Sequence, residues 1–262
     1  MRNCVGVAIW IGIASTVVLA SQALSGPTEA GWQAYVAATE ARVARDRAQA
    51  LAGREAIDRG QILIEKVLMT GPAGELEVPD ATVNHWRGLV LIPGARLDDV
   101  LSHLESEPPD TRQQDIVASA VLDKRPGWLK VSMRVHRSLV LSAIFDTEHE
   151  MTFERHSATR ASGQSTATKI VELDNAGTPR EREKRPEEDR GLLWRWNAYW
   201  RYQQVERGLL VECESLTLSR PVPMLLKPIV HPLVSGLAKE SMEQTLVTLR
   251  KRFAAPAARI GF

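Results

Sequence analysis

The chain has 262 residues, of which 44% are hydrophobic and 25% charged, as expected for one large globular domain. It carries 33 basic and 32 acidic residues, and removal of a leader containing Arg2 would leave 32 of each. A mature chain without net charge has no electrostatic attraction to nucleic acid, so we expect no nucleic-acid partner.

Residues 1–25 predict a secretory signal peptide. Arg2 precedes an uncharged apolar run from Cys4 to Ala20, and small residues then offer cleavage after Ala23 or Ser25. The run is close to the shortest that crosses a bilayer, so an uncleaved anchor is the alternative. We therefore expect an exported protein, periplasmic or extracellular. Its mature form would keep Cys213 alone and could form no internal disulfide.

Residues 26–56 predict an N-terminal amphipathic helix. Between residues 28 and 51, a narrow apolar stripe recurs at steps of three and four, and arginines and acids dominate the remaining face. The stripe consists of Trp32, Tyr35, Val36, Thr39 and Val43, with Ala50 one heptad further on.

The following segment favours strands and two short helices. Residues 62–69 and 81–94 are rich in β-branched residues and are bounded by Gly and Pro turns. Residues 95–106 return to helical spacing, and a second short helix is predicted around residues 111–122. The helical stripe of 95–106 consists of Leu97, Val100, Leu101 and Leu104.

From Trp128 onward the pattern predicts an antiparallel meander. Residues 128–138, 139–155 and 165–173 alternate apolar and polar side chains with short turns between them. The segment 178–190 holds five basic residues, five acidic residues and two prolines, which predicts a solvated loop.

The C-terminal part predicts a broken connection and then a last helix. Pro221, Pro223, Pro228 and Pro232 interrupt the chain before residues 235–253, which have helical spacing. The apolar stripe of that helix consists of Ala238, Met242, Thr245, Leu246, Leu249 and Phe253.

Residues 191–220 predict a hairpin with one aromatic face. Along its first strand the even positions include Trp194, Trp196, Trp200 and Tyr202, and a period of two places them on one side. On the return strand, Val211 and Cys213 share one side and Glu212 and Glu214 the other. Pairing Arg201 with Glu212 would set Trp200 opposite Cys213 and separate the charges from the aromatic rings.

The order of these elements resembles the START-like, or polyketide cyclase/aromatase-like (SRPBCC), helix-grip superfamily. VNHWRGLVLIPG, FDTEHEM, TPREREKRPEEDRG and LLWRWNAYWRYQQVERGLLVECESLTLSRPVP resemble a group of exported bacterial members. The resemblance covers most of residues 30–253. It implies an α+β fold in which a curved antiparallel sheet grips a long C-terminal helix, with a cavity between them that often takes lipids, sterols or aromatic compounds. We assign residues 57–254 to this domain and 255–262 to a C-terminal tail.

In such a fold the inner sheet face and the facing helix stripe supply the candidate ligand-binding residues. Aromatic residues also carry the packing of any core, so in this fold core packing and pocket lining merge. The candidates are Phe145, His149, Met151, Trp194, Trp196, Trp200, Tyr202, Val211, Cys213, Met242 and Leu246.

His149 is the most informative polar candidate, because it lies between Phe145 and Phe153 on an apolar face, where imidazole needs a partner. It is either a core histidine bonded to a neighbour or a ligand contact or base. His156 is seven residues further on and faces the other way, so the two cannot readily share a metal. We expect no metal and no cofactor.

The remaining polar candidates favour structural roles. His85 is interpreted as a structural or surface histidine, and Cys213 as an inert buried thiol. Glu212 and Glu214 are interpreted as cross-strand partners of Arg201 and Arg195 on a charged outer face.

The leading hypothesis is an exported protein that binds or carries a hydrophobic small molecule or lipid without catalysis. No nucleophile elbow, phosphate-binding loop or dinucleotide fingerprint occurs, so we name no catalytic residue. One alternative is an enzyme of cyclase or hydrolase type acting on an apolar substrate, with His149 or His85 as the acid–base group. Another is an envelope interaction module that contacts a protein or a membrane surface through its N-terminal helix or an exposed patch.

Overall fold

The computed structural model describes residues 24–51, 57, 60–71, 74–109, 111, 113, 115–138, 142–221 and 227–254, without the side chains of 227–238. Most of the predicted signal peptide, residues 1–23, and the tail 255–262 lie outside the described residues. Within the described ranges, no helix combines the length and the hydropathy that a membrane crossing requires.

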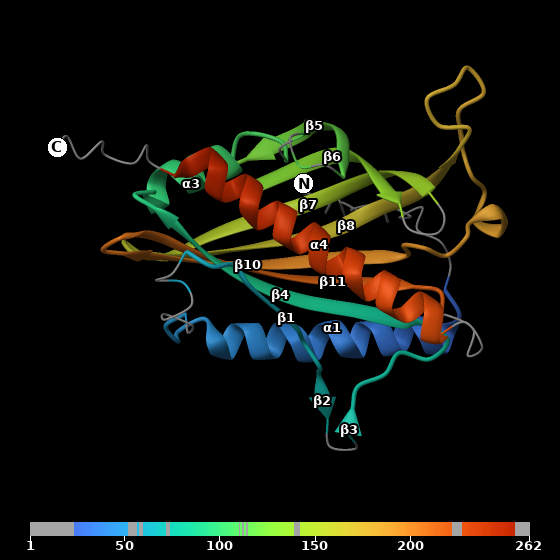
Figure 1. Ribbon diagram of the computed structural model, residues 1–262, viewed down its shortest axis with the longest axis horizontal. Coiled ribbons are helices and arrows are strands. Elements are labelled where there is room, and N and C mark those ends of the chain that lie inside the picture. Colours follow the sequence, from blue (N-terminus) through green and yellow to red (C-terminus); the bar gives the residue numbers. More distant parts are fainter. Residues whose placement is uncertain are drawn as a thin grey trace, which may run out of the picture.

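One large antiparallel sheet forms the centre of the molecule. Its strand order is β1-β4-β11-β10-β8-β7-β6-β5, and β9 pairs with β8 at the side. The short strands β2 (Thr70–Gly71) and β3 (Gly74–Glu75) form a separate hairpin that projects from the sheet (Figure 1). The strands of the large sheet are β1 (Leu63–Lys66), β4 (Thr82–Pro93), β5 (Ile116–Arg125), β6 (Trp128–Ser138), β7 (Ser142–Ser157), β8 (Arg160–Asp174), β9 (Arg182–Glu183), β10 (Arg195–Val205) and β11 (Gly208–Ser219). The predicted antiparallel meander is confirmed.

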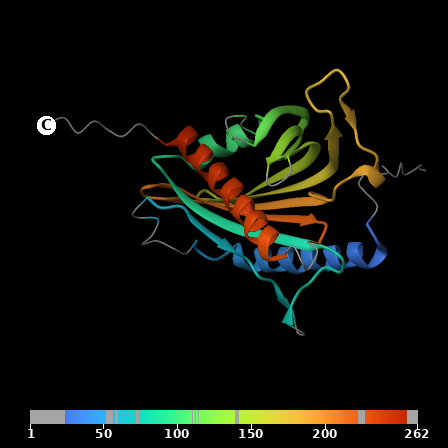
Figure 2. The ribbon, with the colours of Figure 1, turned by 45° about the vertical axis from the view of Figure 1, so that its right-hand side comes forward.

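Two long helices cover opposite faces of this sheet, as Figures 1 and 2 show. Helix α4 (Lys227–Phe253) crosses β4, β1 and β11 on the face that we call inner, and α1 (Gly26–Asp46) packs on the outer face. The short helix α3 (Leu97–Leu104) follows β4 at the predicted place. A curved antiparallel sheet gripping a long C-terminal helix is the predicted α+β helix-grip fold.

The inner face packs on α4 through small and aliphatic residues. Met242 and Leu246 of α4 are buried in one cluster with Val90, Val211 and Cys213. Gly88 of β4 lies directly below them, and a Cβ there would come within 2.6 Å of Leu246 Cδ1 and 2.9 Å of Met242 Cγ. The glycine therefore allows α4 to approach the sheet this closely, although glycine weakens a strand.

The outer face is covered by α1 and is not the solvated charged face that the sequence suggested. Trp32 and Tyr35 of the predicted stripe are buried against Tyr199, Leu216 and Leu218 of the sheet. The helix begins at an N-cap, Ser25, whose hydroxyl oxygen accepts a hydrogen bond of 3.3 Å from the backbone N–H of Thr28.

The helix predicted around residues 111–122 is wrong, because most of this segment forms strand β5. Its β-branched residues Ile116, Val117 and Val121 suit a strand, and β5 pairs antiparallel with β6. Tertiary pairing with a neighbouring strand thus overrides a weak local helical pattern.

Two connections are more ordered than predicted. The charged segment 178–190 contains β9 and a 3-10 turn, η1 (Pro186–Glu188), and it returns to the sheet. There Lys184 Nζ and Arg190 N donate to the buried carboxylate of Glu172, at 2.7 and 3.1 Å. The last helix starts at Lys227, eight residues before the predicted start at 235. Pro228 lies in the first turn, where proline is tolerated, whereas Pro232 lies one turn further on and removes one hydrogen bond of the helix.

Candidate ligand-binding site

The predicted hairpin forms with the predicted register. Arg201 is paired with Glu212 and Trp200 with Cys213, and Arg201 Nε donates to Glu212 Oε1 at 2.7 Å. The rings of Trp200 and Tyr202 lie parallel, with their centroids 6.4 Å apart. The hairpin therefore presents Trp200 and Tyr202 to the inner face, and Tyr199 and the Arg201–Glu212 ion pair to the outer face.

Trp194 departs from this arrangement. Strand β10 begins at Arg195, so the alternation of a strand does not extend to Trp194. Its indole packs against the cluster below α1 that contains Trp32, Leu216 and Leu218. The prediction that Trp194 shares a face with Trp196 and Trp200 is wrong, and we do not retain it as a ligand contact.

Small residues line the middle of the inner face. Every second residue of β8 from Ala161 to Ala167 is small, namely Ala161, Gly163, Ser165 and Ala167, and Ala198 lies opposite Ser165 on β10. Five inner residues at this place are only half-buried, although α4 covers the same face. We call this set the inner trough: Ala167, Trp196, Ala198, Trp200 and Ser215.

Three contacts hold Trp196 in place within the inner trough. Its Nε1–H donates to the hydroxyl of Ser215 at 3.2 Å, and its ring lies perpendicular to the His149 ring at a centroid distance of 4.9 Å. The guanidinium of Arg137 lies 5.3 Å from the centroid of the same ring. Trp196 is thus held by a hydrogen bond, an aromatic contact and a cation–π contact while part of its surface stays accessible.

His149 is buried and has both ring nitrogens bonded. The Thr147 hydroxyl donates to the carbonyl of Met133 at 3.1 Å, so it can only accept from His149 Nε2, which lies 3.2 Å away. Nδ1 is then the acceptor for the Ser165 hydroxyl at 3.3 Å. Burial lowers the pKa of His149 to about 4. At neutral pH its imidazole is uncharged and its lone pair is engaged, which matches a core histidine.

A polar cluster ties α4 to the end of β6 beside Trp196. Arg137 Nη1 donates to Asp115 Oδ2 at 2.6 Å and to Ser241 Oγ at 3.0 Å, and Ser241 donates to the same carboxylate oxygen at 2.7 Å. No local pattern selects these residues, because Asp115 and Ser241 are 126 positions apart. They form the polar border of the inner trough.

The other predicted ligand residues divide between two packed clusters. Tyr202, Val211, Cys213, Met242 and Leu246 are buried together below α4, whereas Phe145 packs with Ala143 and Leu193 near the other end of the sheet. Met151 is half-buried on β7. Burial raises the pKa of the Cys213 thiol well above its usual range, as expected for an inert thiol.

His85 lies on the outer face and joins α1 to the sheet. Its Nε2–H donates to Glu214 Oε1 at 2.5 Å, and its Nδ1 accepts from the Tyr35 hydroxyl at 3.0 Å. Arg42 of α1 makes an ion pair with the same carboxylate, which replaces the predicted pairing of Glu214 with Arg195. Arg195 pairs instead with Glu29 of α1 at 2.7 Å. Burial lowers the pKa of His85 and so favours its uncharged imidazole. The role of this network is structural, because it joins α1 to the sheet.

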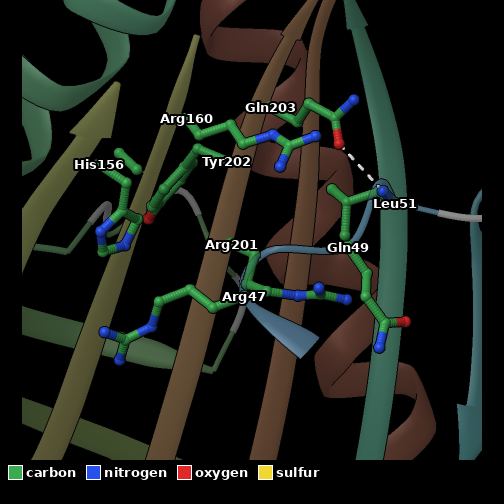
Figure 3. A pocket seen from close by; sticks show the side chains of 9 residues that line it. Arg47, Gln49, Leu51, His156, Arg160, Arg201, Tyr202 and Gln203 are labelled. Carbon is green, nitrogen blue, oxygen red and sulfur yellow. Dashed lines mark hydrogen bonds between the residues drawn. The ribbon is translucent and has the colours of Figure 1, made fainter. Parts of the chain in front are cut away.

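A separate small cavity lies beside the C-terminal end of α1 (Figure 3). Its volume of about 10 Å³ suffices for about one water molecule. Two arginines at this cavity donate to main-chain carbonyls at and just beyond the end of the helix, Arg201 to Asp46 at 2.6 Å and Arg160 to Ala48 at 2.7 Å. Gln203 accepts from the backbone N–H of Leu51 at 2.9 Å, the dashed line in Figure 3. These hydrogen bonds around the cavity attach the end of α1 to the sheet. The cavity itself is too small for an organic ligand.

Among the described residues, no group of three histidine, cysteine or carboxylate side chains is placed to hold a metal ion.

Comparison with known proteins relates the chain to solved structures by shape. No protein-family model matches the chain, and no curated protein matches it in sequence. A STAR-related lipid transfer protein from Xanthomonas axonopodis is 15% identical, with a TM-score of 0.42, covering 71% of this chain and 98% of that one. Human STARD10 is 12% identical, with a TM-score of 0.44 and coverage of 80% and 78%. The Zhui aromatase/cyclase from Streptomyces sp. R1128 is 10% identical, with a TM-score of 0.39 and coverage of 65% and 93%. The START-like helix-grip architecture itself follows from the strand order and from α4 lying across the sheet.

Proposed function

We propose that this protein is exported and binds or carries a hydrophobic small molecule or lipid, without catalysis, in the space between the inner trough and α4. The main support for the proposal is the composition and partial burial of the inner trough. Half-buried tryptophans stand beside alanine and serine below a covering helix, and apolar walls with few polar groups are the usual lining of a small-molecule site. The lipid transfer proteins among the matched structures share the fold and are consistent with this ligand class.

The chemistry of the polar groups supports binding without catalysis. A general base needs a free lone pair within reach of a substrate proton. His149 Nδ1 is engaged by Ser165, and the low pKa of its imidazole makes it a weak base. His85 lies on the opposite face of the sheet, below α1.

Export is supported by the sequence alone, through Arg2, the apolar run after it and the small residues at 21–25. Cys213 is the one cysteine among the described residues and is a buried free thiol, so this part of the fold does not depend on a disulfide and suits a protein that loses Cys4 with its leader. Sequencing the N-terminus of protein secreted or released from the envelope tests export. An unprocessed cytosolic chain would contradict it.

Titration with the fluorescent fatty acid cis-parinaric acid tests ligand binding. Energy transfer from the tryptophans should show saturable binding, and Ala167→Leu should weaken it about tenfold or more by filling the inner trough. Thr166→Leu places the same side chain on the other face of the same strand and is the matched control. Equal affinities for the two variants would refute this location of the ligand.

A further inference from the structure

Strand β5 concentrates the exposed apolar side chains of the described residues. Of the four large hydrophobic residues that are exposed, three belong to β5: Val117 at 54%, Val121 at 36% and Leu122 at 49%. From Val117 to Pro126 every residue except Ser119 is exposed. The strand is also the last one in the strand order, so within the described part of the chain one of its edges has no strand partner.

The irregular backbone of β5 argues against pairing with another strand. The register with β6 shifts between Ile116 and Ala118 and again between Val121 and Asp123, which leaves Val117 and Leu122 as the extra residues of two bulges. Bulges twist a sheet edge and interrupt its row of hydrogen-bonding groups, and proteins use them to prevent strand addition. A partner that needs no strand register, such as a lipid surface, fits this edge better than a second β-strand.

The charges of the β5–β6 hairpin also fit a lipid surface. Residues 116–138 contain five basic residues and one acidic residue. Three of the basic residues are matched by acids elsewhere, in the pairs Lys130–Glu148, Arg134–Asp146 and Arg137–Asp115. At the hairpin tip, Arg125 pairs with Asp123, and within residues 116–138 Asp123 is the one acid beside Lys124 and Arg125.

An aromatic side chain lies next to these tip charges. Trp128 is half-buried, and the guanidinium of Arg125 lies 4.7 Å from the centroid of its ring. Tryptophan beside basic residues and exposed aliphatic side chains is typical of segments that lie at the boundary between headgroups and acyl chains.

We infer that the β5–β6 hairpin docks on a membrane surface that contains anionic lipid. Val117, Val121 and Leu122 enter the headgroup region, and Lys124 and Arg125 face the lipid phosphates and carboxylates. This docking is independent of whether the inner trough holds a ligand, because none of the five trough residues belongs to β5 or β6.

A site-specific fluorescence label tests the inference in the full chain. The apolar run near the N-terminus can itself bind vesicles, so the measurement must report on β5 and not on binding alone. We would attach a nitrobenzoxadiazole label to Leu122→Cys in a Cys4→Ser background, since Cys213 is buried. The matched control carries the label on Leu68→Cys, because Leu68 is 56% exposed and precedes β2, far from β5 in the strand order.

Vesicles of phosphatidylcholine with phosphatidylserine should brighten and blue-shift the label at position 122 and leave that at 68 unchanged. Lys124→Gln should weaken this response about fivefold, the effect of one surface charge. Adding Ala167→Leu should leave the response of the label at position 122 unchanged. A loss of ligand binding is thereby distinguished from a loss of docking.

Three results would overturn the inference. The first is a label at 122 that does not respond while the chain sediments with vesicles. The second is an equal response at 68. The third is a response at 122 that follows protein concentration without lipid and so indicates self-association.

Discussion

Acidification should destabilise the protein through His149. The pKa of the buried imidazole is about 4, against about 6.5 for an unfolded histidine. The unfolded chain therefore binds a proton at a higher pH than the native chain, and stability falls as the pH falls through this window. Between pH 7 and pH 5 the loss from His149 alone amounts to about 2 kcal/mol, and it approaches about 3 kcal/mol near pH 4.

Urea unfolding measured at a series of pH values from 7 to 5 is the assay, because most carboxylates stay ionised over this range. His149→Gln keeps a donor for Thr147 but cannot titrate, so the slope of the unfolding free energy with pH should become shallower. His85 also has a lowered pKa and should leave a residual slope.

The matched control is Phe145→Leu, a core substitution on the same strand. It should lower the free energy of unfolding at every pH and keep the wild-type slope. A His149→Gln protein whose slope equals that of the wild type would refute the assignment of His149 as a neutral core residue.

Three further substitutions should destabilise the protein by distinct mechanisms, each measured by urea unfolding. Gly88→Val places side-chain atoms against Leu246 and should cost about 2 kcal/mol or more by forcing α4 from the sheet. Gly88→Ala adds only the Cβ that meets Leu246 and should cost less, and a Gly88→Ala protein as stable as the wild type would contradict the close approach. Glu214→Gln removes the carboxylate beside Arg42 and His85, so we expect a loss of about 3 kcal/mol. Ser25→Ala removes the N-cap of α1 at a cost of about 1 kcal/mol, and Ser25→Asp should restore most of it.

The period of the side chains was enough to predict most of the sheet. The register of β10 with β11 agrees with the predicted match of Arg201 to Glu212, because a slip of one residue would set charged side chains among the tryptophans of the inner face. The apolar stripes likewise predicted the two long helices, since Trp32, Tyr35, Met242 and Leu246 are all buried.

What the sequence could not supply are the contacts between distant segments. The sequence predicts Glu214 on a charged outer face, because nothing local shows that α1 lies over this face with Arg42 and Tyr35. The segment around Val117 has a weak helical pattern and becomes a strand only through pairing with β6.

Trp196 and Trp200 of the inner trough are predicted from the sequence, whereas Ala167, Ala198 and Ser215 are not, for a related reason. The alternation of Ala161, Gly163, Ser165 and Ala167 is visible in the sequence, but small residues predict space only once a covering helix is known. Arg137, Asp115 and Ser241 come together only in the folded chain, so no local pattern selects them.

Native mass spectrometry of the protein purified from its own cells tests the central claim most directly. Our account predicts a mass above that of the polypeptide, owing to an apolar molecule that solvent extraction removes and that Ala167→Leu protein lacks. The account would be contradicted by wild-type protein that shows only the mass of its polypeptide and, after extraction, fails to take up cis-parinaric acid.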